Sequence, residues 1–384
     1  MINKRLYISL LIFWVMAAAN TQPLPLSYFA REKVYGSYDE AFEDSWNVVI
    51  LDLAHQSLTF NAERVSRLEN LRVLNLAGNP GLDMEEAFTK KYFGGLSDIQ
   101  ILDLQENNLK SVPTGINRFG NLTILYAGKN QLSEIPPFFC SLKYLEVISF
   151  HHNRLREIPE CLSKLDSLHT LDLSGNTQME TEVLFSRLNS LPNLKRLYLS
   201  SCGFTMLPLE INNLQAIELL NLSKNKLNKP PQYLFHLSSL RELNLSGNGI
   251  AELPDDLVHL TRLEVLVLTD NNLQNLPPAI GALEKLIYLD LSGNRLQYLP
   301  DSLFRLKGLK ELNLSKNQLE KIPAAITDLS ELQVLDLSGN KLKALPYELE
   351  YCRALRILNL SGNPIAPDQK KLLKEKYPQI KINF

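Results

Sequence analysis

The sequence has few cysteines, no excess of one charge, and little apolar sequence of membrane-spanning length. Only 4 of its 384 residues are Cys, and 40 basic and 42 acidic side chains leave a formal net charge of −2. Nucleic acids and anionic membranes are bound through an excess of Lys and Arg, so neither is indicated as a partner. No apolar run beyond the N-terminal one approaches the roughly 20 residues of a spanning helix. We expect no nucleic-acid partner and no integral membrane segment in the processed protein.

Motifs that would indicate an enzyme are also missing. No Ser-His-Asp constellation, phosphate-binding loop or Cys-x-x-Cys pair can be read from the chain. Aspartates recur at regular intervals, but they fall at one position of a repeated pattern and suit a solvated surface. The sequence therefore predicts no catalytic site and no cofactor.

The N-terminus has the layout of a secretory signal. Lys4 and Arg5 precede an apolar run from Leu6 to Met16, and three alanines follow. This order is typical of a signal peptide that is cleaved after a small residue. Residues 1–19 are therefore predicted to be a signal peptide, with an uncleaved membrane anchor as the alternative. Export predicts a secreted, periplasmic or cell-surface-associated protein.

One pattern, L-x-x-L-x-L-x-x-N-x-L, recurs along most of the chain. Its spacing is 23 residues at all but two steps, which are 28 and 26 residues long. Gln56 and Cys202 stand at the Asn position of two copies, which makes fourteen copies in all. A fixed period of this size is the signature of a repeat array, in which each repeat packs against its neighbours. The asparagines of the pattern are Asn79, Asn107, Asn130, Asn153, Asn176, Asn225, Asn248, Asn271, Asn294, Asn317, Asn340 and Asn363.

Each copy predicts one coil of a solenoid. The Leu-x-Leu alternation gives a short strand with one buried face, and strands of neighbouring coils pair in parallel. Beyond the strand, the Asn side chain can donate to and accept from buried backbone groups of its own and the adjacent coil. A Leu-Pro pair then ends the extended segment and starts a tight or 3₁₀-like turn on the outer face.

The repeats resemble those of leucine-rich repeat proteins. A copy such as "LIYLDLSGNRLQYLPDSLFRLKG" is similar to the Pro-containing type found in Ras-suppressor-like proteins and in many exported bacterial proteins. The resemblance covers residues 48–365 and implies an α/β solenoid of horseshoe shape. Its parallel β-sheet would line the concave face, and 3₁₀ or helical turns the convex face. The family is specific for the fold and leaves the partner open.

Both ends of such an array would expose the core, so both are expected to be capped. Residues 20–47 are predicted to hold a linker and a capping helix that begins with a capping box from Ser37 to Glu40. Residues 366–384 predict a basic amphipathic helix followed by a closing strand at 380–382.

The two longer copies predict α-helices in place of the tight outer turn. In the first, Asp83 is the expected N-cap and Gly94 the expected stop. The second helix is expected within residues 180–192.

The four cysteines divide into two kinds. Cys202 stands in the Asn column and Cys352 in a leucine column, so both are predicted to be buried thiols. Cys140 and Cys161 lie on the outer turns of adjacent coils and could form a disulfide in an exported protein. Their offset of two positions from registry favours the alternative, that their Cα atoms are too far apart.

One group of side chains on the predicted concave face differs from the short polar residues around it. Tyr126 and Tyr198 interrupt a row of mostly Asp, Asn and Ser, and a His-His pair lies between them in the sequence. Tyr and Arg often dominate interface energies. With strands about 4.8 Å apart, coils four to seven span on the order of 15 Å. The predicted partner-binding patch comprises Tyr126, Lys129, His151, His152, Arg196 and Tyr198.

Other interpretations of these residues are open. The tyrosines could merely stack along the sheet while the histidines cap a turn. A zinc site at His151 and His152 would need a third ligand, and His55 is too many coils away. The patch predicts a non-catalytic exported module that binds a protein or peptide. A cell-envelope or glycan-binding structural protein is the alternative, because aromatics beside Asp and Asn also suit sugars.

Overall fold

The computed structural model describes residues 29–58, 65, 67–89 and 96–384. The chain divides into two compact units: unit 1 is Met1–Glu180 with Ser190–Asn193, and unit 2 is Thr181–Asn189 with Leu194–Phe384. The predicted signal peptide, residues 1–19, lies outside the described residues. Within the described ranges, no helix combines the length and apolar character needed to cross a membrane.

Unit 1 contains a parallel sheet in which each strand pairs with the next one along the chain. The last residues of successive strands align with one another. From the second strand onward they are Asp52, Asn75, Asp103, Tyr126, Ser149 and Asp172. The row of concave-facing residues predicted from the repeat is therefore confirmed in this unit. The strands are β1 (Val34–Tyr35), β2 (Ile50–Asp52), β3 (Val73–Asn75), β4 (Ile101–Asp103), β5 (Ile124–Tyr126), β6 (Val147–Ser149) and β7 (Thr170–Asp172).

Unit 2 repeats the same arrangement with a second run of parallel strands. Tyr198 aligns with Asn221 and Asn244, and the register continues to the last strand, where Asn359 faces Asn383. The strands are β8 (Arg196–Tyr198), β9 (Leu219–Asn221), β10 (Glu242–Asn244), β11 (Val265–Val267), β12 (Tyr288–Asp290), β13 (Glu311–Asn313), β14 (Val334–Asp336), β15 (Ile357–Asn359) and β16 (Lys381–Asn383). The fourteen predicted coils correspond to β2 to β15.

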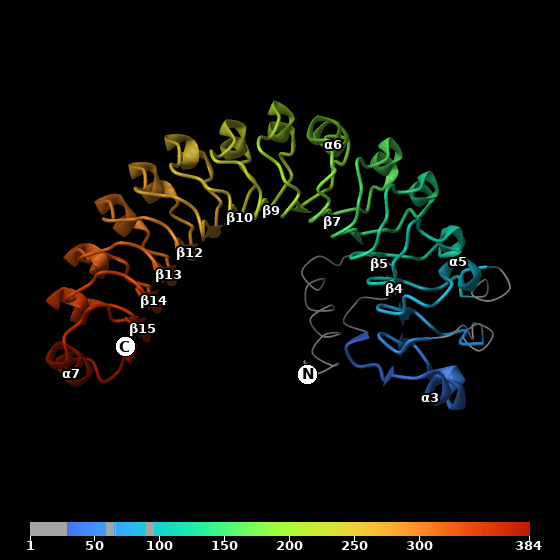
Figure 1. Cartoon of the computed structure of the whole chain (residues 1–384), viewed down its shortest axis with the longest axis horizontal. Coiled ribbons are helices and arrows are strands. Elements are labelled where there is room, and N and C mark those ends of the chain that lie inside the picture. Colours follow the sequence, from blue (N-terminus) through green and yellow to red (C-terminus); the bar gives the residue numbers. More distant parts are fainter. Residues whose placement is uncertain (1–28, 59–64, 66, 90–95) are drawn as a thin grey trace. The chain divides into compact units, whose positions relative to one another are not determined.

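The outer turn of most coils is a 3₁₀ helix that starts directly after proline. Pro300, for example, has φ −71° and precedes the helix Asp301–Arg305. Within each unit the strands line the concave side and these turns the convex side (Figure 1). The 3₁₀ helices are η2 (Thr114–Arg118), η3 (Pro137–Ser141), η4 (Glu160–Lys164), η5 (Leu209–Asn213), η6 (Gln232–His236), η7 (Asp255–His259), η8 (Pro278–Ala282), η9 (Asp301–Arg305), η10 (Ala324–Asp328) and η11 (Tyr347–Tyr351).

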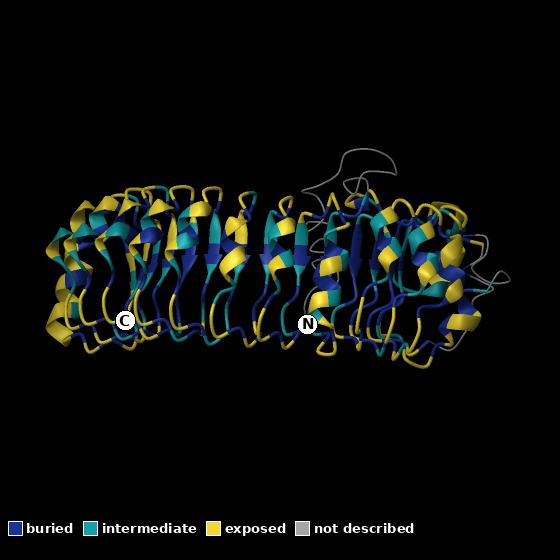
Figure 2. Ribbon diagram, turned by 90° about the horizontal axis from the view of Figure 1, so that it is seen from above, coloured by how far each residue is buried: buried dark blue, intermediate teal, exposed yellow. Residues whose placement is uncertain are grey.

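The core of each coil is leucine, and the repeated asparagine ties one coil to the coil before it. Buried residues follow the strands, while exposed ones gather on the turns (Figure 2). The amide of Asn130 donates to the carbonyls of Ala127 and Gly128 in its own coil and to that of Leu104 in the preceding coil, at 2.9–3.1 Å. Its oxygen accepts from the backbone N–H groups of Asn107 and Leu109. One buried side chain thus satisfies five backbone groups, as the repeat predicts.

The N-terminal cap differs from the prediction in two respects. It contains a strand, β1, which pairs with β2 and which was not expected. Its helix α3 (Tyr38–Glu43) does begin at Ser37, whose Oγ accepts from the Glu40 N–H. The Glu40 carboxylate, however, accepts from the N–H of Gly36, one residue earlier than a capping box requires. A short 3₁₀ helix, η1 (Ser45–Asn47), then leads into β2.

The remaining helices lie where the longer copies and the C-terminus predict them, with different lengths. Asp83 caps α5, since its side chain accepts from the Glu86 N–H, but α5 (Met84–Ala87) ends after four residues. The predicted stop at Gly94 lies outside the described residues. In unit 2, α6 is Thr181–Leu188 and α7 is Pro367–Lys376. The closing strand β16 starts one residue later than predicted.

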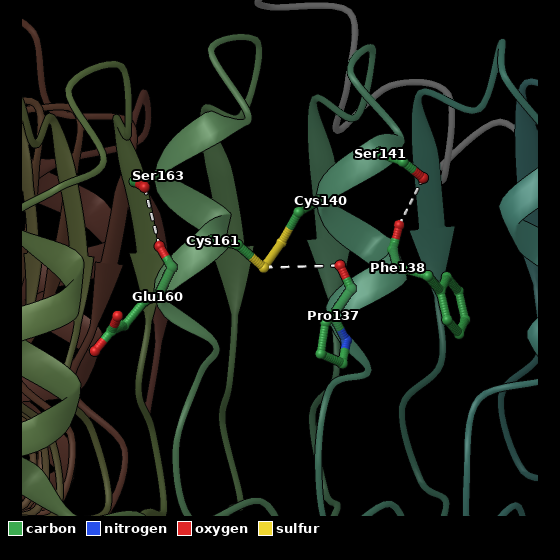
Figure 3. The surroundings of a disulfide bond; sticks show 7 residues. All are labelled: Pro137, Phe138, Cys140, Ser141, Glu160, Cys161 and Ser163. Carbon is green, nitrogen blue, oxygen red and sulfur yellow. Dashed lines mark hydrogen bonds between the residues drawn. A yellow bond between two sulfur atoms is a disulfide. The ribbon is translucent and has the colours of Figure 1, made fainter.

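Cys140 and Cys161 form a disulfide between η3 and η4 (Figure 3). The Cα atoms are 5.7 Å apart across a separation of 21 residues, well within the range that a disulfide spans. The two-residue offset from registry is therefore no obstacle, because the stacked outer turns bring the end of one 3₁₀ helix near the start of the next. Cys202 and Cys352 are buried and stand outside the disulfide, as predicted.

Candidate functional site

The loops that follow the strands of unit 1 turn through a residue with left-handed backbone. This residue directly precedes the repeated asparagine, and it has φ 59° at Glu106, 53° at Lys129, 51° at His152 and 75° at Gly175. Left-handed backbone costs a residue with a Cβ roughly 1 kcal/mol or more, whereas glycine adopts it freely. Side chains at Glu106, Lys129 and His152 are therefore present in spite of a conformational cost.

The two histidines that follow β6 each pack over a glycine of a neighbouring coil. A Cβ built on Gly128, in the preceding coil, would lie 2.2 Å from ring atoms of His151. A Cβ on Gly175, in the following coil, would lie 2.4 Å from Nδ1 of His152. The two rings are 5.5 Å apart between centroids and nearly perpendicular, at 79°. The two histidines thus contact the coils on both sides of their own. Each ring occupies the space that a side chain at Gly128 or Gly175 would fill.

His151 also belongs to a hydrogen-bonded group with Ser149 and Asp172. Ser149 Oγ lies 2.9 Å from His151 Nδ1 and 3.1 Å from Asp172 Oδ2, to which it donates. Ser149 has one hydroxyl proton, and it is donated to Asp172. In the bond between Ser149 and His151, the donor must therefore be the N–H at Nδ1 of His151. A nucleophilic serine needs the opposite arrangement, with a histidine nitrogen that accepts its proton. The group resembles a catalytic triad only in composition, and it holds the imidazole in place.

The charges around these loops nearly cancel. Lys129 Nζ lies 2.7 Å from Glu106 Oε1, and this bond is the largest cause that holds the pKa of the Glu106 carboxyl below its usual value. Burial lowers the pKa of His151, and this outweighs the Asp172 carboxylate, which acts in the opposite direction. His151 is therefore neutral at pH 7, and the surface offers polar hydrogen-bonding groups rather than a strong charge.

Tyr126 connects these loops to an apolar cluster on the same concave face. Its ring is half-buried and packs against a cluster that includes Ile124 and Val147. Asp103, aligned with Tyr126 on the next strand, is 2% exposed. Burial raises the pKa of Asp103 to about 6, although its carboxylate accepts hydrogen bonds from Gln105. Asp103 therefore loses much of its charge as the pH falls below about 6.

In unit 2, Arg196 and Tyr198 flank the middle residue of β8, on one face of the strand. Arg196 aligns with Leu219, and Leu219 with Glu242 on β10. Burial raises the pKa of the Glu242 carboxyl, and the positive charge of Arg196 partly opposes this. Arg196 and Tyr198 thus form a second, mixed surface that belongs to unit 2.

The structure brings together four of the six predicted patch residues in unit 1 and the other two in unit 2. We call Tyr126, Lys129, His151 and His152 the β5–β6 patch. Several contributing residues were not predicted, namely Glu106, Gly128, Ser149 and Asp172. Glu106 and Gly128 lie one 23-residue repeat before Lys129 and His151, and Ser149 lies one repeat after Tyr126. A comparison of neighbouring copies position by position could have found these three, and Asp172 lies one further repeat after Ser149. Among the described residues, no three His, Cys, Asp or Glu side chains form a group that could hold a metal ion.

Comparison with known protein families agrees with the geometry of the coils. A family described as "Leucine-rich repeat region" matches residues 52–198 and 228–316, and one described as "Leucine rich repeat" matches residues 192–250 and 322–365. Together the two segments of the first match span more than half of the chain. The chain belongs to the leucine-rich repeat family. No curated protein sequence matches it.

Solved leucine-rich repeat structures are similar to the chain over most of its length. A leucine-rich repeat protein of Leptospira interrogans is 32% identical, with a TM-score of 0.72, and the match covers 92% of this chain and 100% of that one. An internalin from Listeria monocytogenes is 22% identical, with a TM-score of 0.62, over 76% of this chain and 82% of that one. The Toll–Spätzle complex of Drosophila contains a chain that is 22% identical, with a TM-score of 0.63, over 86% of this chain and 46% of that one.

The leucine-rich repeat fold is typical of protein-interaction modules and of non-enzymatic binding scaffolds. Each unit has the features on which such a scaffold depends: a parallel sheet with its strands in sequence order, side chains presented in rows, and coils tied together by buried asparagines. A surface that is ordered in advance lowers the entropic cost of association.

Proposed function

We propose that this leucine-rich repeat chain is an exported, non-catalytic recognition module that binds a protein or peptide through the concave face of unit 1. The observation that carries the proposal is the β5–β6 patch itself. Its residues Lys129 and His152 occupy left-handed positions at a conformational cost, and Tyr126 presents an aromatic ring beside an apolar cluster. Other coils also have non-glycine residues at this position, so the proposal depends chiefly on the Tyr126 ring beside the apolar cluster and on the two adjacent histidines.

The character of the patch points to a largely uncharged partner segment. Lys129 is already paired with Glu106, and burial lowers the pKa of His151 although the Asp172 carboxylate acts in the opposite direction. An apolar or aromatic side chain set against Tyr126, with backbone groups bonded to the polar rim, suits this surface better than an acidic or basic one. Arg196 and Tyr198 are proposed as a separate contact surface of unit 2.

Export is part of the proposal. The N-terminal layout of residues 1–19 supports it, and so does the disulfide Cys140–Cys161, because disulfides persist mainly in oxidising compartments. The Pro-containing 23-residue repeat, similar to that of exported bacterial proteins, is in keeping with this location. N-terminal sequencing of the protein recovered from the cell exterior or envelope is expected to begin just after Ala19.

The partner-binding role is tested by capture with matched variants. The purified protein is immobilised and exposed to secreted and surface proteins of its own source, and the captured protein is then titrated directly. Tyr126→Ala is expected to weaken binding by roughly 1–3 kcal/mol, or about 5- to 160-fold. Tyr298→Ala is the control, since Tyr298 is 56% exposed and lies in a loop of unit 2 outside the sheet.

Two outcomes contradict the proposal. Unchanged affinity for Tyr126→Ala and for His151→Ala would remove the β5–β6 patch as the contact surface. Binding of glycans on an array, lost in Tyr126→Ala and without any protein captured, would replace the proposal with a sugar-binding role.

A further inference from the structure

Strand β11 differs from the other strands of unit 2 on its concave face. It lies between β10 and β12 (Figure 1), and its first and third residues, Val265 and Val267, are both partly exposed. Among β8 to β16, all of which lie within the described residues, no other strand carries apolar side chains at both of these positions. The third residue is Asn on β9, β10, β13 and β15, and Asp on β12 and β14. β11 therefore interrupts a polar surface.

Carboxylates stand on both sides of this apolar strand. The first residues of β10 to β13 align in register from strand to strand, and they are Glu242, Val265, Tyr288 and Glu311. Glu242 and Glu311 are exposed, and neither forms an ion pair with another described residue. The two are separated by three strand steps of about 4.8 Å, or about 14 Å in all. Two unpaired carboxylates thus flank an apolar centre.

The Asp290 carboxylate adds to the negative charge at this centre. Asp290 is 9% exposed and aligns with Val267 on β11. Its oxygens accept hydrogen bonds from the Tyr288 hydroxyl at 3.2 Å and from the Asn313 amide at 3.0 Å. They also accept from the N–H and the hydroxyl of Ser292, at 2.9 and 2.6 Å. All four donors are neutral, so they hold the carboxylate in place without cancelling its charge.

The basic side chains of these strands do not balance the carboxylates. Within β10 to β13 and the residue before each strand, the only cations are Arg241 and Lys310. Arg241 is already paired with Glu264, with 2.7 Å between Nη1 and Oε1. Lys310 therefore remains against three carboxylates, and the surface carries an excess of negative charge.

The pKa values of two groups are in keeping with this excess. Burial is the largest cause that raises the pKa of the Glu242 carboxyl, and it outweighs the opposing charge of Arg196. Burial also raises the pKa of Tyr288 to about 12, and the negative charges of Asp290 and Glu311 contribute. Both shifts show that a further negative charge is disfavoured at this surface. A cation that approaches it is favoured for the same reason.

We propose that the concave face of β10 to β13 binds an extended segment of a partner protein with the pattern basic-x-apolar-x-basic, laid across the strands. Alternate side chains of an extended chain point to one face, so all three recognition residues face the sheet. Four steps of about 3.4 Å reach about 14 Å, the separation of β10 from β13. The basic side chains then meet Glu242 and Glu311, and the apolar one covers Val265 and Val267. This surface belongs to unit 2 and goes beyond the proposed function, which concerns unit 1.

Fluorescence polarisation of labelled synthetic peptides with the full chain tests the proposal. The probe is Gly-Arg-Ser-Leu-Ser-Arg-Gly with blocked ends. The reference peptide, Gly-Arg-Arg-Ser-Ser-Leu-Gly, has the same composition and charge in another order. The probe is expected to bind about tenfold more tightly or better, because only its basic residues are spaced to meet both carboxylates. Equal affinity for the two peptides, or no binding of the probe at millimolar concentration, would overturn the proposal.

Matched variants of the chain locate the site. Glu242→Gln with Glu311→Gln is expected to weaken binding of the probe about tenfold. Glu284→Gln with Glu331→Gln removes the same charge from exposed turns outside the sheet, and it is expected to change the affinity by less than about twofold. Val267→Asn introduces the residue that β10 and β13 carry at this position, so the coil is expected to fold as before. It is expected to weaken binding about fivefold, because apolar contact is lost.

The results distinguish this proposal from the proposed function. Tyr126→Ala, in unit 1, is expected to leave binding of the probe unchanged. If the variant at Glu242 and Glu311 loses no more affinity than the variant at Glu284 and Glu331, the surface on β10 to β13 is wrong, whatever the capture experiment gives. Loss of probe binding in the first variant, together with partner capture that is insensitive to Tyr126→Ala, would retain this surface and remove the proposed function.

Discussion

The imidazole ring of His151 fills the space over Gly128, where a Cβ would lie 2.2 Å from its Cε1 and Nδ1 atoms. Gly128 is needed at this place for room rather than for backbone freedom, since it is not among the residues with positive φ. The ring of His151 thus packs against the backbone of the preceding coil, and the repeat pattern requires neither the histidine nor the glycine.

Gly128→Ala is expected to lower the free energy of unfolding by roughly 1–3 kcal/mol, because the new methyl group must push the hydrogen-bonded ring of His151 aside. In the double variant with His151→Ala, most of this loss is expected to disappear. Urea denaturation of the four proteins in the cycle measures the coupling. Gly120→Ala is the control, since a Cβ there meets nothing within 4 Å. Additive effects of the two substitutions would show that the ring does not depend on Gly128.

The coils could be predicted from the sequence because each depends on a side chain that recurs. Asn130 bonds to five backbone groups, and Asn271 of unit 2 bonds to the five equivalent groups. Leu102 points inward for the same reason as Leu125. The strand positions and the proline-initiated turns follow from this repetition. The strand β1 was missed because it has only two residues and no repeat of its own.

The candidate site could be predicted only in part, since it depends on contacts that the repeat does not specify. The role of His151 is set by Gly128 in another coil and by Asp172 in a third. A row of apolar residues, from Ile50 on β2 to Val147 on β6, was missed because only the middle concave position was compared between copies, and this row lies two residues earlier on each strand. The disulfide could not be decided, because the spacing of the outer turns is not encoded in one residue type.

Asp103→Asn is expected to stabilise the protein near neutral pH. The folded-state pKa of about 6 lies above the ordinary value for Asp, so the folded state binds the proton more tightly than the unfolded chain does. The wild type is therefore expected to lose stability as pH rises from about 4 to about 6, and to stay lower above that range. The substitution removes this loss and adds roughly 1–3 kcal/mol at pH 7, with little effect at pH 4.

Urea denaturation of the wild type and Asp103→Asn at several pH values between 4 and 7 checks this expectation. Asp301→Asn, at an exposed position on η9, serves as the control for the loss of one negative charge. A gain in stability for Asp103→Asn that is the same at pH 4 and pH 7 would show that the Asp103 carboxyl does not titrate in this range.

Asn130→Ala is expected to be among the most damaging substitutions in unit 1. It leaves the carbonyl of Leu104 and the N–H groups of Asn107 and Leu109 without their buried partner. Each buried polar group that loses its partner costs about 1–3 kcal/mol, so a total loss of several kcal/mol is expected. Thermal unfolding followed by circular dichroism measures it. Asn121→Ala removes an exposed hydrogen bond to Asp98 and is expected to change stability by less than about 1 kcal/mol. An equal loss of stability in Asn130→Ala and Asn121→Ala would show that the buried hydrogen bonds of the repeated asparagine do not stabilise the coils.

Removal of the disulfide is expected to destabilise unit 1 without changing its fold. The bond between Cys140 and Cys161 closes a loop across 21 residues, for which loop-closure entropy gives about 3 kcal/mol. Cys140→Ser with Cys161→Ser is expected to lower the free energy of unfolding by roughly 2–4 kcal/mol. Thiol titration of the denatured wild type should detect the thiols of Cys202 and Cys352 before reduction, and all four cysteines after it. Cys352→Ala is the matched control, since it removes a buried thiol outside the disulfide. Reaction of all four cysteines without reductant, in protein isolated from its native compartment, would show that the disulfide is not formed there and would remove one support for export.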